Sequence, residues 1–389
     1  MPQSTKQLYT FPFLLLCLSH VLFAGSFNMM IPELPSFLTS LGGEDYKGLI
    51  IALFTLSAGL SRPLSGKLAD TIGRVPVMVV GTIVCVIASL LYPLISSVAG
   101  FLLLRFFHGF STGFKPTAAT AFAADIVPTN RRGEAMGLLG ISMNLGSSMF
   151  PPIGSYLAMS YSIDMMFYTS SFLALISILM LLGLKETLEN KQKFTPTHLK
   201  ITSKDILEPK AMPPAIVILF IYLTFGALLT ITPDQSEHIG LQNKGLLFTS
   251  FTFFAILSRA VAGRFSDQYG RVIVIKFSIL LVVSALVYMG LANTPTHFMI
   301  AAGALGFSTG VAAPAVFAWV IDVSPTDRMA RSMATAYIAL EIGIGSGALL
   351  SAWLYDNNPA NFGLAFFTIA GLTLLAGFYL QFVYKRPLL

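Results

Sequence analysis

Twelve apolar stretches, each long enough for a helix to cross a lipid bilayer, divide almost the whole chain. A helix needs about 20 residues to cross about 30 Å of hydrocarbon. A strand lying alone in lipid would leave backbone groups unpaired, so only helices suit such segments. The expected spans lie near residues 11–33, 48–69, 75–96, 98–125, 134–158, 165–185, 213–233, 245–267, 272–292, 296–322, 332–354 and 361–384. They predict an all-α membrane protein with twelve transmembrane helices.

The composition also indicates that lipid surrounds much of the protein. Apolar residues make up 55% of the 389 positions and charged residues only 11%, with a mean hydropathy of +0.75. A soluble domain carries about 25% charged residues, so lipid is expected to cover much of this surface. The two cysteines, Cys17 and Cys85, both lie in apolar runs. They provide neither a disulfide framework nor metal-ligand spacing, which predicts core cysteines and no metal site.

The basic residues are distributed as in a membrane protein, so the net charge of +6 does not indicate a nucleic-acid partner. Lys47 and Lys244 fall in loops on one side, and Arg105 and Lys115 fall within a span. The remaining Lys and Arg residues lie at the tails or in the alternate loops, at 67–74, 131–132, 185–210, 259–276, 328–331 and 385–386, together with Lys6 and Arg62. Basic loops face the cytoplasm, which predicts that both termini are cytoplasmic.

The first span has an alternative interpretation as a signal peptide. Lys6 precedes it, and "AGS" at 24–26 resembles a cleavage site. The apolar run continues past that site, which favours a retained span.

The chain contains a repeat with a constant shift of 197 residues. "GFSTG" occurs at 109–113 and 306–310, and "SRPLSGKLADTIGRV" (61–75) matches "SRAVAGRFSDQYGRV" (258–272) at seven of fifteen positions. The same shift pairs "DIVPTNR" (125–131) with "DVSPTDR" (322–328), and "KGL" (47–49) with "KGL" (244–246). Six spans separate the copies, an even number, so both halves have the same orientation and form a parallel repeat.

The repeat divides the chain into an N-terminal six-helix bundle at 1–185 and a C-terminal one at 213–389. Between them, residues 186–212 carry five lysines and four acidic residues, with Pro196 and Pro209. This segment is expected to be a solvated cytoplasmic linker. Contact of its basic side with anionic lipid headgroups is the alternative.

The repeated loop carries a family resemblance. "GKLADTIGR" (66–74) resembles the loop motif G-x-L-x-D-r-x-G-r of the major facilitator superfamily, and "GRFSDQYGR" (263–271) resembles its weaker twin. The resemblance covers essentially the whole chain, and it implies two six-helix bundles around a central cavity that opens to alternate sides. It also implies a cytoplasmic gate, closed while the outer side is open. The expected gate residues are Gly66, Asp70, Gly73, Arg74, Gly263, Asp267, Gly270, Arg271, Asp125, Arg131, Asp322 and Arg328.

Asp70 is expected to form ion pairs among Lys67, Arg74 and the basic loop 131–132, which break in another state. The alternative is that the basic residues only fix the topology, and for Lys67 that interpretation is preferred. Asp125 and Asp322, repeated near the cytoplasmic ends, suit gate or capping roles better than substrate contact.

Two further motifs resemble those of drug:proton antiporters. "LLLRFFHGFSTG" (102–113) is similar to the fourth-helix motif R-x-x-q-G, with Arg105 and Gly109 matching and His108 where the family has glutamine. The end of the first span, "IPELPSFLTSLG" (31–42), also resembles that branch. These resemblances imply proton-coupled export.

The segment "GSSMFPPIGS" (146–155) resembles the fifth-helix antiporter motif G-x-x-x-G-P-x-x-G-G. Gly146, Pro151 and Gly154 match, whereas Phe150 and Ser155 replace two glycines. Small residues and proline also serve close packing and bending in any helix. The departures leave export in doubt.

Polar residues that differ between the two copies are the candidates for function. Arg105, His108 and Lys115 surround the first GFSTG, and Ala302, Leu305 and Ala312 take their places in the second. At about 100° per residue, these three side chains and Thr112 occupy one stripe of the helix. A charged side chain at mid-membrane depth is expected to face a wet cavity or a partner. Alternatives remain: Arg105 as a brace against carbonyls, Lys115 reaching the interface, and His108 bonded to a helix neighbour.

The second half contributes an acid. Glu341 lies well inside a span, where the first copy has Asn144, and Tyr337 lies four residues earlier on the same face. Burial and a nearby cation act in opposite senses on the proton affinity of a carboxylate, which makes Glu341 the candidate for proton coupling. Asn28, Tyr222 and Phe225 are further candidates for lining the cavity. Four groups near the outer surface suit loop or vestibule roles, namely Glu33, Asp234, Glu237 and His238.

The sequence predicts a secondary transporter of the bacterial cytoplasmic membrane that exports a small, zwitterionic or carboxylate-bearing molecule in exchange for protons. It is expected to act as a monomer among membrane lipids, without a cofactor and with the proton gradient as its energy source. No nucleotide-binding loop, metal-ligand cluster or Ser/His/Asp arrangement suggests an enzyme. A same-fold importer, symporter or facilitator is the first alternative, and a non-transporting receptor or scaffold is the second.

Overall fold

Long helices make up almost all of the protein. The computed structural model describes residues 9–128, 131–189, 191–199, 207–325 and 328–384, and no β-strand occurs among them. The helices of the first half are α1 (Phe11–Met29), α2 (Leu34–Ser40), α3 (Lys47–Thr71), α4 (Arg74–Leu91), α5 (Val98–Ile126), α6 (Arg132–Ser160) and α7 (Ile163–Leu182). Those of the second half are α8 (Met212–His238), α9 (Gly245–Tyr269), α10 (Arg271–Gly290), α11 (Pro295–Val323), α12 (Met329–Tyr355) and α13 (Phe362–Phe378).

The twelve expected spans each lie on one of the long helices. The short α2 continues α1 after the 3-10 turn Ile31–Glu33, so these elements together occupy the first span. Nine helical stretches of the described chain are long and apolar enough to cross a membrane. The helices α5, α6 and α9 do not contribute to those nine, and α5 carries Arg105 and Lys115 in its interior.

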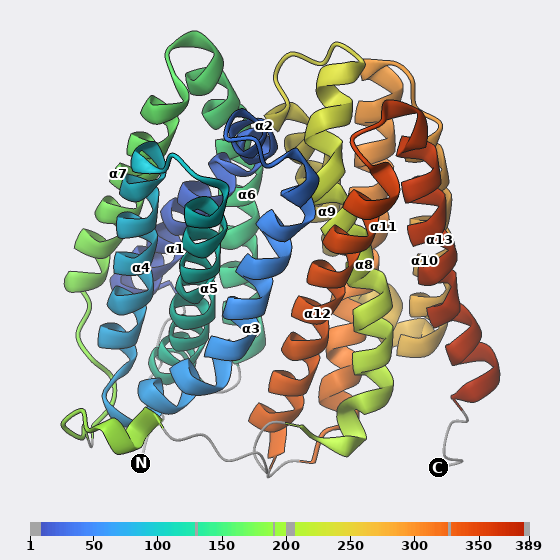
Figure 1. The fold of residues 1–389 in the computed structure, drawn as a ribbon. Helices are drawn as coiled ribbons and strands as arrows, with labels where there is room; N and C mark the ends of the chain where they lie inside the picture. Colours follow the sequence, from blue (N-terminus) through green and yellow to red (C-terminus); the bar gives the residue numbers. More distant parts are fainter. Residues whose placement is uncertain (1–8, 129–130, 190, 200–206, 326–327, 385–389) are drawn as a thin grey trace.

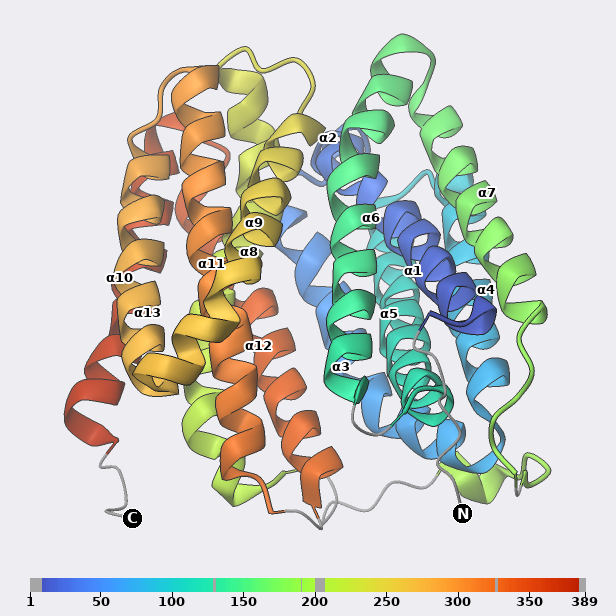
Figure 2. The same cartoon turned by 180° about the vertical axis from the view of Figure 1, so that it is seen from behind.

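The helices of each half pack mainly on one another (Figures 1 and 2). In the first half, α1 packs on α6 and α7, while α5 packs on α3 and α4. In the second half, α8 packs on α12 and α13, while α11 packs on α9 and α10. These pairs correspond under the shift of 197 residues. Two antiparallel contacts, α3 with α12 and α6 with α9, join the halves and correspond to each other as well.

The repeated GFSTG segment is a site of close helix approach. A Cβ on Gly109 would lie 2.8 Å from the carbonyl carbon of Phe54 on α3, and one on Gly306 would lie 2.7 Å from that of Phe251 on α9. The second glycines of the two segments meet α3 and α9 in the same way, because Gly113 lies against Ala58 and Gly310 against Ala255. Only glycine permits these approaches, and this explains the repetition of the pentapeptide.

The glycines of the fifth-span motif pack α6 on α1. A Cβ on Gly146 would lie 2.6 Å from that of Ala24, and Gly154 lies against the carbonyl group of Met29. Pro151 packs against Gly245 of α9 instead. This segment therefore contacts both its own half and the other one.

The molecule has two ends, which Figure 1 displays at its top and bottom. We call the end with α2 and the first residues of α3 and α9 the α2 side. We call the end with residues 186–189, residues 191–199 and the first residues of α4, α6, α10 and α12 the linker side. The start of α4 on the linker side requires glycine, because Gly73 has φ +128°, and Gly270 before α10 has φ +86°.

Candidate functional site

A buried ion pair joins the two halves near the middle of their helices. Arg62 of α3 donates from Nη2 and Nε to Oε1 of Glu341 on α12, at 2.6 and 3.2 Å. The two side chains are only 17% and 9% exposed. The Arg62 guanidinium also lies over the ring of Tyr337, 4.8 Å from its centroid. The sequence placed Glu341 and Tyr337 on one face, and the structure brings them together with Arg62.

Local sequence explains how α3 and α12 come so close. A Cβ on Gly59, one turn before Arg62, would meet the Glu341 side chain at 3.4 Å. Pro63 lies within α3, where its missing N–H removes one helix hydrogen bond and favours a bend. Arg62 had been grouped with the basic residues that fix topology. Its place next to Pro63 inside an apolar run was the signal for a different role.

A second group of polar residues, Tyr222, Arg259 and Asn144, lies on α8, α9 and α6. The Tyr222 ring stacks on Phe225 with centroids 5.1 Å apart, and Phe225 in turn packs on Phe251 of α9 with centroids 5.3 Å apart. The Nε atom of Arg259 and the Nδ2 atom of Asn144 are buried and have no hydrogen-bond partner in the described protein. Under the shift of 197 residues, Arg259 corresponds to Arg62, and Asn144 to Glu341.

Arg105 lies within the first half and does not reach the central ion pair. Its side chain is 1% exposed, and it donates from Nε to the Ile50 carbonyl at 3.0 Å and from Nη1 to the Tyr92 hydroxyl at 3.3 Å. The guanidinium lies 4.5 Å from the centroid of the Phe54 ring. The structure therefore corrects the expected cavity-facing position, because a backbone carbonyl and an aromatic face of α3 satisfy the charge. This is the bracing role that was the alternative.

His108 and Lys115 are equally enclosed. The His108 ring contacts the Tyr92 hydroxyl and the Cys85 sulfur at 3.2 and 3.3 Å. Lys115 donates to the backbone oxygen and the hydroxyl of Ser19, both at 3.0 Å, and to the Ser177 hydroxyl. Neither side chain is exposed, so His108 and Lys115 face α1, α4 and α7 instead of a wet cavity.

The smaller candidates make local contacts. Thr112 donates to the Gly109 carbonyl at 3.0 Å, within its own helix. Asn28 donates to the Ala24 carbonyl at 2.8 Å and to the Ser147 hydroxyl at 3.0 Å, which ties α1 to α6. Neither contact joins the two halves.

Lysines of the repeated KGL segments connect the halves on the α2 side. Lys47 donates to Asp234 of α8 at 2.5 Å. Lys244 donates to Glu237 at 2.7 Å and to the Ser36 hydroxyl of the first half at 2.8 Å, and it lies 3.9 Å from Glu33. Each repeated lysine thus contacts the first span of the opposite half. The sequence had placed these acids in vestibule or loop positions without identifying their partners.

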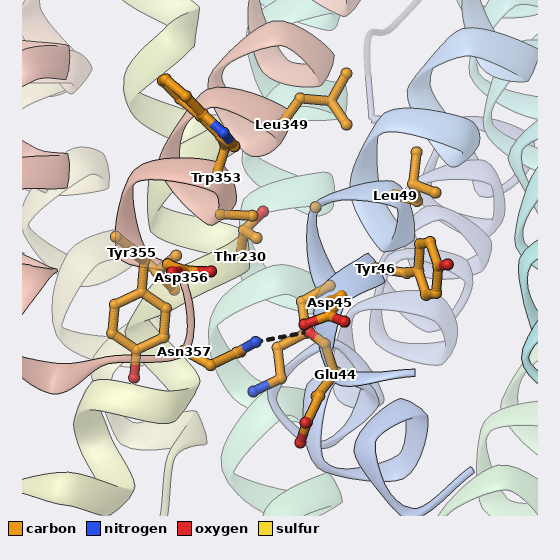
Figure 3. Close-up of a pocket in the computed structure, with 14 residues that line it drawn as sticks. Glu44, Asp45, Tyr46, Leu49, Thr230, Leu349, Trp353, Tyr355, Asp356 and Asn357 are labelled. Atoms are coloured by element: carbon orange, nitrogen blue, oxygen red, sulfur yellow. Dashed lines mark hydrogen bonds between the residues drawn. The ribbon is translucent and has the colours of Figure 1, made fainter. Parts of the chain in front are cut away.

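A pocket of about 400 Å³ lies beside Lys47 on the α2 side (Figure 3). It is lined by residues of both halves, among them Glu44, Asp45 and Tyr46 of the first and Trp353, Asp356 and Asn357 of the second. The Asn357 side chain donates to the Glu44 carbonyl at 3.1 Å, which is a further bond between the halves. Asp356 and Asn357 have left-handed φ values of 48° and 51°. No sequence motif predicted this pocket.

The motif residues on the linker side pair within their own half. Arg74 donates to Asp70 at 2.6 Å and to Asp125 at 3.2 Å, and Arg271 repeats the second contact with Asp322 at 3.1 Å. The Asp70 side chain is 70% exposed.

Arg131 of the basic loop and Arg328 have other acids as partners. Arg131 pairs with Glu134 at 2.9 Å, and Arg328 lies 3.7 Å from Glu208. A Cβ on Gly66 would meet Thr117 at 3.9 Å, an ordinary contact distance. Gly263 and Asp267 lie outside the residues whose side chains the structure describes.

An unexpected residue, Glu186, completes the start of α4. Its carboxylate accepts from the backbone N–H groups of Arg74 and Val75, both at 3.0 Å. A carboxylate at a helix N-terminus is stabilised by the free N–H groups and the helix dipole. The first residue of the expected linker therefore belongs to the motif structure.

Known proteins with this architecture are transporters. A family model described as Major Facilitator Superfamily matches residues 16–242 and 214–388. A relative named "Multi-drug resistance efflux pump PmrA homolog", from Lactococcus lactis, is 29% identical over 351 residues, which is 84% of either chain. "Multidrug resistance protein MdtG" of Escherichia coli is 25% identical over 91% of this chain and 90% of its own.

Solved structures share the fold at low identity. The human organic anion transporter MFSD10 superposes with a TM-score of 0.72 at 21% identity, over 97% of this chain and 100% of that one. A D-xylose–proton symporter superposes with a TM-score of 0.76 at 15% identity, over 96% of this chain and 97% of that one.

Proposed function

Because the chain belongs to the major facilitator superfamily, and is therefore a multi-pass membrane transporter and not an enzyme, we propose that it exports small organic molecules in exchange for protons. The efflux pumps among its relatives support export of drug-like compounds. The proton gradient is then the energy source, and no cofactor is required. The protein acts as a monomer in the bacterial cytoplasmic membrane.

The ion pair between Arg62 and Glu341 is the observation that supports proton coupling. It joins α3 to α12, so its strength affects which arrangement of the two halves is stable. Protonation of Glu341 removes the negative charge, and breaking a largely buried pair from one side is costly. A proton on Glu341 would therefore favour a different arrangement of the halves, which is the differential interaction that coupling requires.

The remaining contacts between the halves support an arrangement open toward the linker side. Hydrogen bonds and ion pairs between described residues of 9–185 and 213–384 extend from the α2 side to Arg62–Glu341. Beyond that level, the motif residues Asp70 and Arg74 pair inside the first half. We take the linker side as cytoplasmic, following the basic-residue distribution, so this is the inward-open state.

In this proposal, residues 1–185 and 213–389 move as two six-helix bundles. Outward opening breaks the ion pair of Lys47 with Asp234 and the contacts of Lys244 with Ser36 and Glu33, and it frees Asp70 and Arg74 to close the cytoplasmic side. Membrane lipids surround the bundles.

The substrate is proposed to be zwitterionic or to carry a carboxylate, since cationic and anionic groups lie together at the centre. An organic anion transporter shares the fold, which is compatible with such a substrate. A proton-coupled importer is the second candidate function, because a sugar–proton symporter has the same fold.

The test compares Glu341→Gln with the protein's own sequence in inverted membrane vesicles. A pH-sensitive dye inside the vesicles reports the pH of the lumen. When a fluorescent substrate is added outside, the unaltered protein should release protons from the lumen and raise its pH, and Glu341→Gln should not. Substrate exchange without a pH gradient should persist in that variant, because the glutamine mimics the protonated acid. Asp164→Asn is the matched control, since it removes one exposed acid at the start of α7. Proton release by Glu341→Gln at the unaltered rate would refute this coupling role. Net movement of substrate out of the vesicle lumen, instead of into it, would favour the importer.

A further inference from the structure

We infer that Arg259, Asn144 and Tyr222 form a subsite that binds the anionic group of the transported molecule. This inference rests on the proposed transport function and adds a defined position and a defined ligand chemistry to it. The argument begins with the symmetry between the two contacts that join the halves.

The contact of α6 with α9 repeats the contact of α3 with α12 in the same register. Gly48 lies against Ala348, and the equivalent residue Gly245 lies against Pro151. Continued along both helices, this register brings Arg259 to the level of Asn144, as Arg62 is brought to Glu341. The first pair has opposite charges, whereas in the second an amide takes the place of the carboxylate. The positive charge of Arg259 is therefore not neutralised by its symmetry partner.

The hydrogen-bonding state of these residues indicates a ligand that accepts. Buried donors in proteins are nearly always satisfied, yet Arg259 Nε and Asn144 Nδ2 are both buried without a partner among the residues that the structure describes. Two free donors, one of them cationic, require an acceptor, and a carboxylate supplies two oxygens in the geometry that a guanidinium matches. A cation held within a membrane segment is a functional position by default.

The third member, Tyr222, extends the subsite with a hydroxyl and an aromatic face. Its ring stacks on Phe225, which packs on Phe251 of α9, two helical turns before Arg259. A flat apolar group attached to the carboxylate would find an aromatic surface there. Arg62 cannot serve as the anion site in this state, since Glu341 already occupies it. The subsite thus favours an organic carboxylate with an aromatic body.

The test uses two dyes that differ only in the anionic group: a rhodamine with a free carboxylate and the methyl ester of the same dye. Fluorescence anisotropy measures their binding to the full-length protein in lipid nanodiscs. The free acid should bind at least about tenfold more tightly than the ester. Arg259→Gln should remove that difference.

Asn144→Glu is the sharper variant, because it places a carboxylate where the first pair has one. It should lower the affinity for the free acid by about tenfold and leave ester binding within about twofold. Lys276→Gln on α10 is the control: it removes a positive charge from a side chain that is hydrogen-bonded to Gln381, and it should leave the affinity for both dyes unchanged. A melting curve for each variant confirms folding.

The outcomes separate this inference from the proposed function. Three results would overturn the anion subsite even if vesicles export the dyes. The protein could bind the acid and the ester equally, it could bind neither dye, or Arg259→Gln could lower the affinity for both dyes equally. Preference for the acid that depends on Arg259, without any flux in vesicles, supports the subsite and removes the transport function.

Discussion

Gly109 offers the clearest test of how the helices of each half are held together. Replacement with alanine would place a Cβ 2.8 Å from the carbonyl carbon of Phe54 and closer still to the carbonyl oxygen. Ordinary Cβ contacts lie at 3.4–4 Å, so α5 and α3 would have to separate by more than half an ångström. Backbone atoms of α3 cannot rotate out of the way as a flexible side chain can.

The expected cost follows from overpacking. Insertion of a methyl group into a well-packed interface costs about 1–3 kcal/mol. Gly306→Ala should cost a similar amount, because it meets Phe251 in the same way in the second half. The two sites share no partner, so the double variant should lose approximately the sum. Gly140→Ala is the matched control: it lies in α6 with nothing within 4 Å of the added Cβ. There the substitution should be neutral or should stabilise by about 0.4–1 kcal/mol.

Thermal unfolding of purified protein, followed by intrinsic tryptophan fluorescence at one heating rate, measures these differences. A loss of 1 kcal/mol shifts Tm by about 2–4 °C in a domain of 150–250 residues. We expect Gly109→Ala to melt several degrees below the unaltered protein and Gly140→Ala to melt at or above it. Equal melting temperatures for Gly109→Ala and Gly140→Ala would refute the claim that this pentapeptide sets the helix distance.

Two other substitutions test the placement of charges. Asp234→Asn removes the ion-pair partner of Lys47, one of the two lysines that connect the halves on the α2 side. Spin labels across that side should report a larger fraction of the open arrangement, and an unchanged distance distribution would contradict the proposed role. Lys115→Met should leave the free energy of unfolding within about 1 kcal/mol, because a buried cation is replaced by a similar volume and the hydroxyls of Ser19 and Ser177 still bond to each other at 2.9 Å. A large loss of stability in a melting curve would show instead that the Lys115 ammonium is essential to the packing.

The sequence predicted the helices well because their determinants are local. A run of about 20 apolar residues is sufficient to define a membrane helix, and each expected span lies on a long helix. Gly73 and Gly270 were also recognisable, since the family motif requires a backbone conformation that only glycine adopts easily. The direction in which a helical stripe faces is not local. Angles around α5 placed Arg105 and Lys115 on one side, but those angles carry no information on which helices lie opposite.

The contacts between the halves were missed for the same reason. Lys47 and Lys244 were counted as loop charges, although Lys47 begins α3 and Lys244 directly precedes α9, on the side that is otherwise poor in basic residues. Arg62 was counted as a topology signal, because a basic residue close to a charged loop usually has that role. Its actual partner is 279 positions away, at Glu341, and only the packing of α3 on α12 identifies it.

Comparison of the two copies remains informative once the contacts are known. Residues that differ between halves fall into two groups. Arg105 and Lys115 differ from their counterparts but bond only within the first half, so their asymmetry concerns how that half is built. Glu341 and Asn144 differ at the two places where the halves meet, and there the asymmetry changes the charge of the interface. A symmetric transporter with two ion pairs would resist opening equally at both contacts. Among the described side chains, Arg62 has an ion pair and Arg259 has none. In our two proposals, a proton acts on the first contact and an anionic ligand on the second.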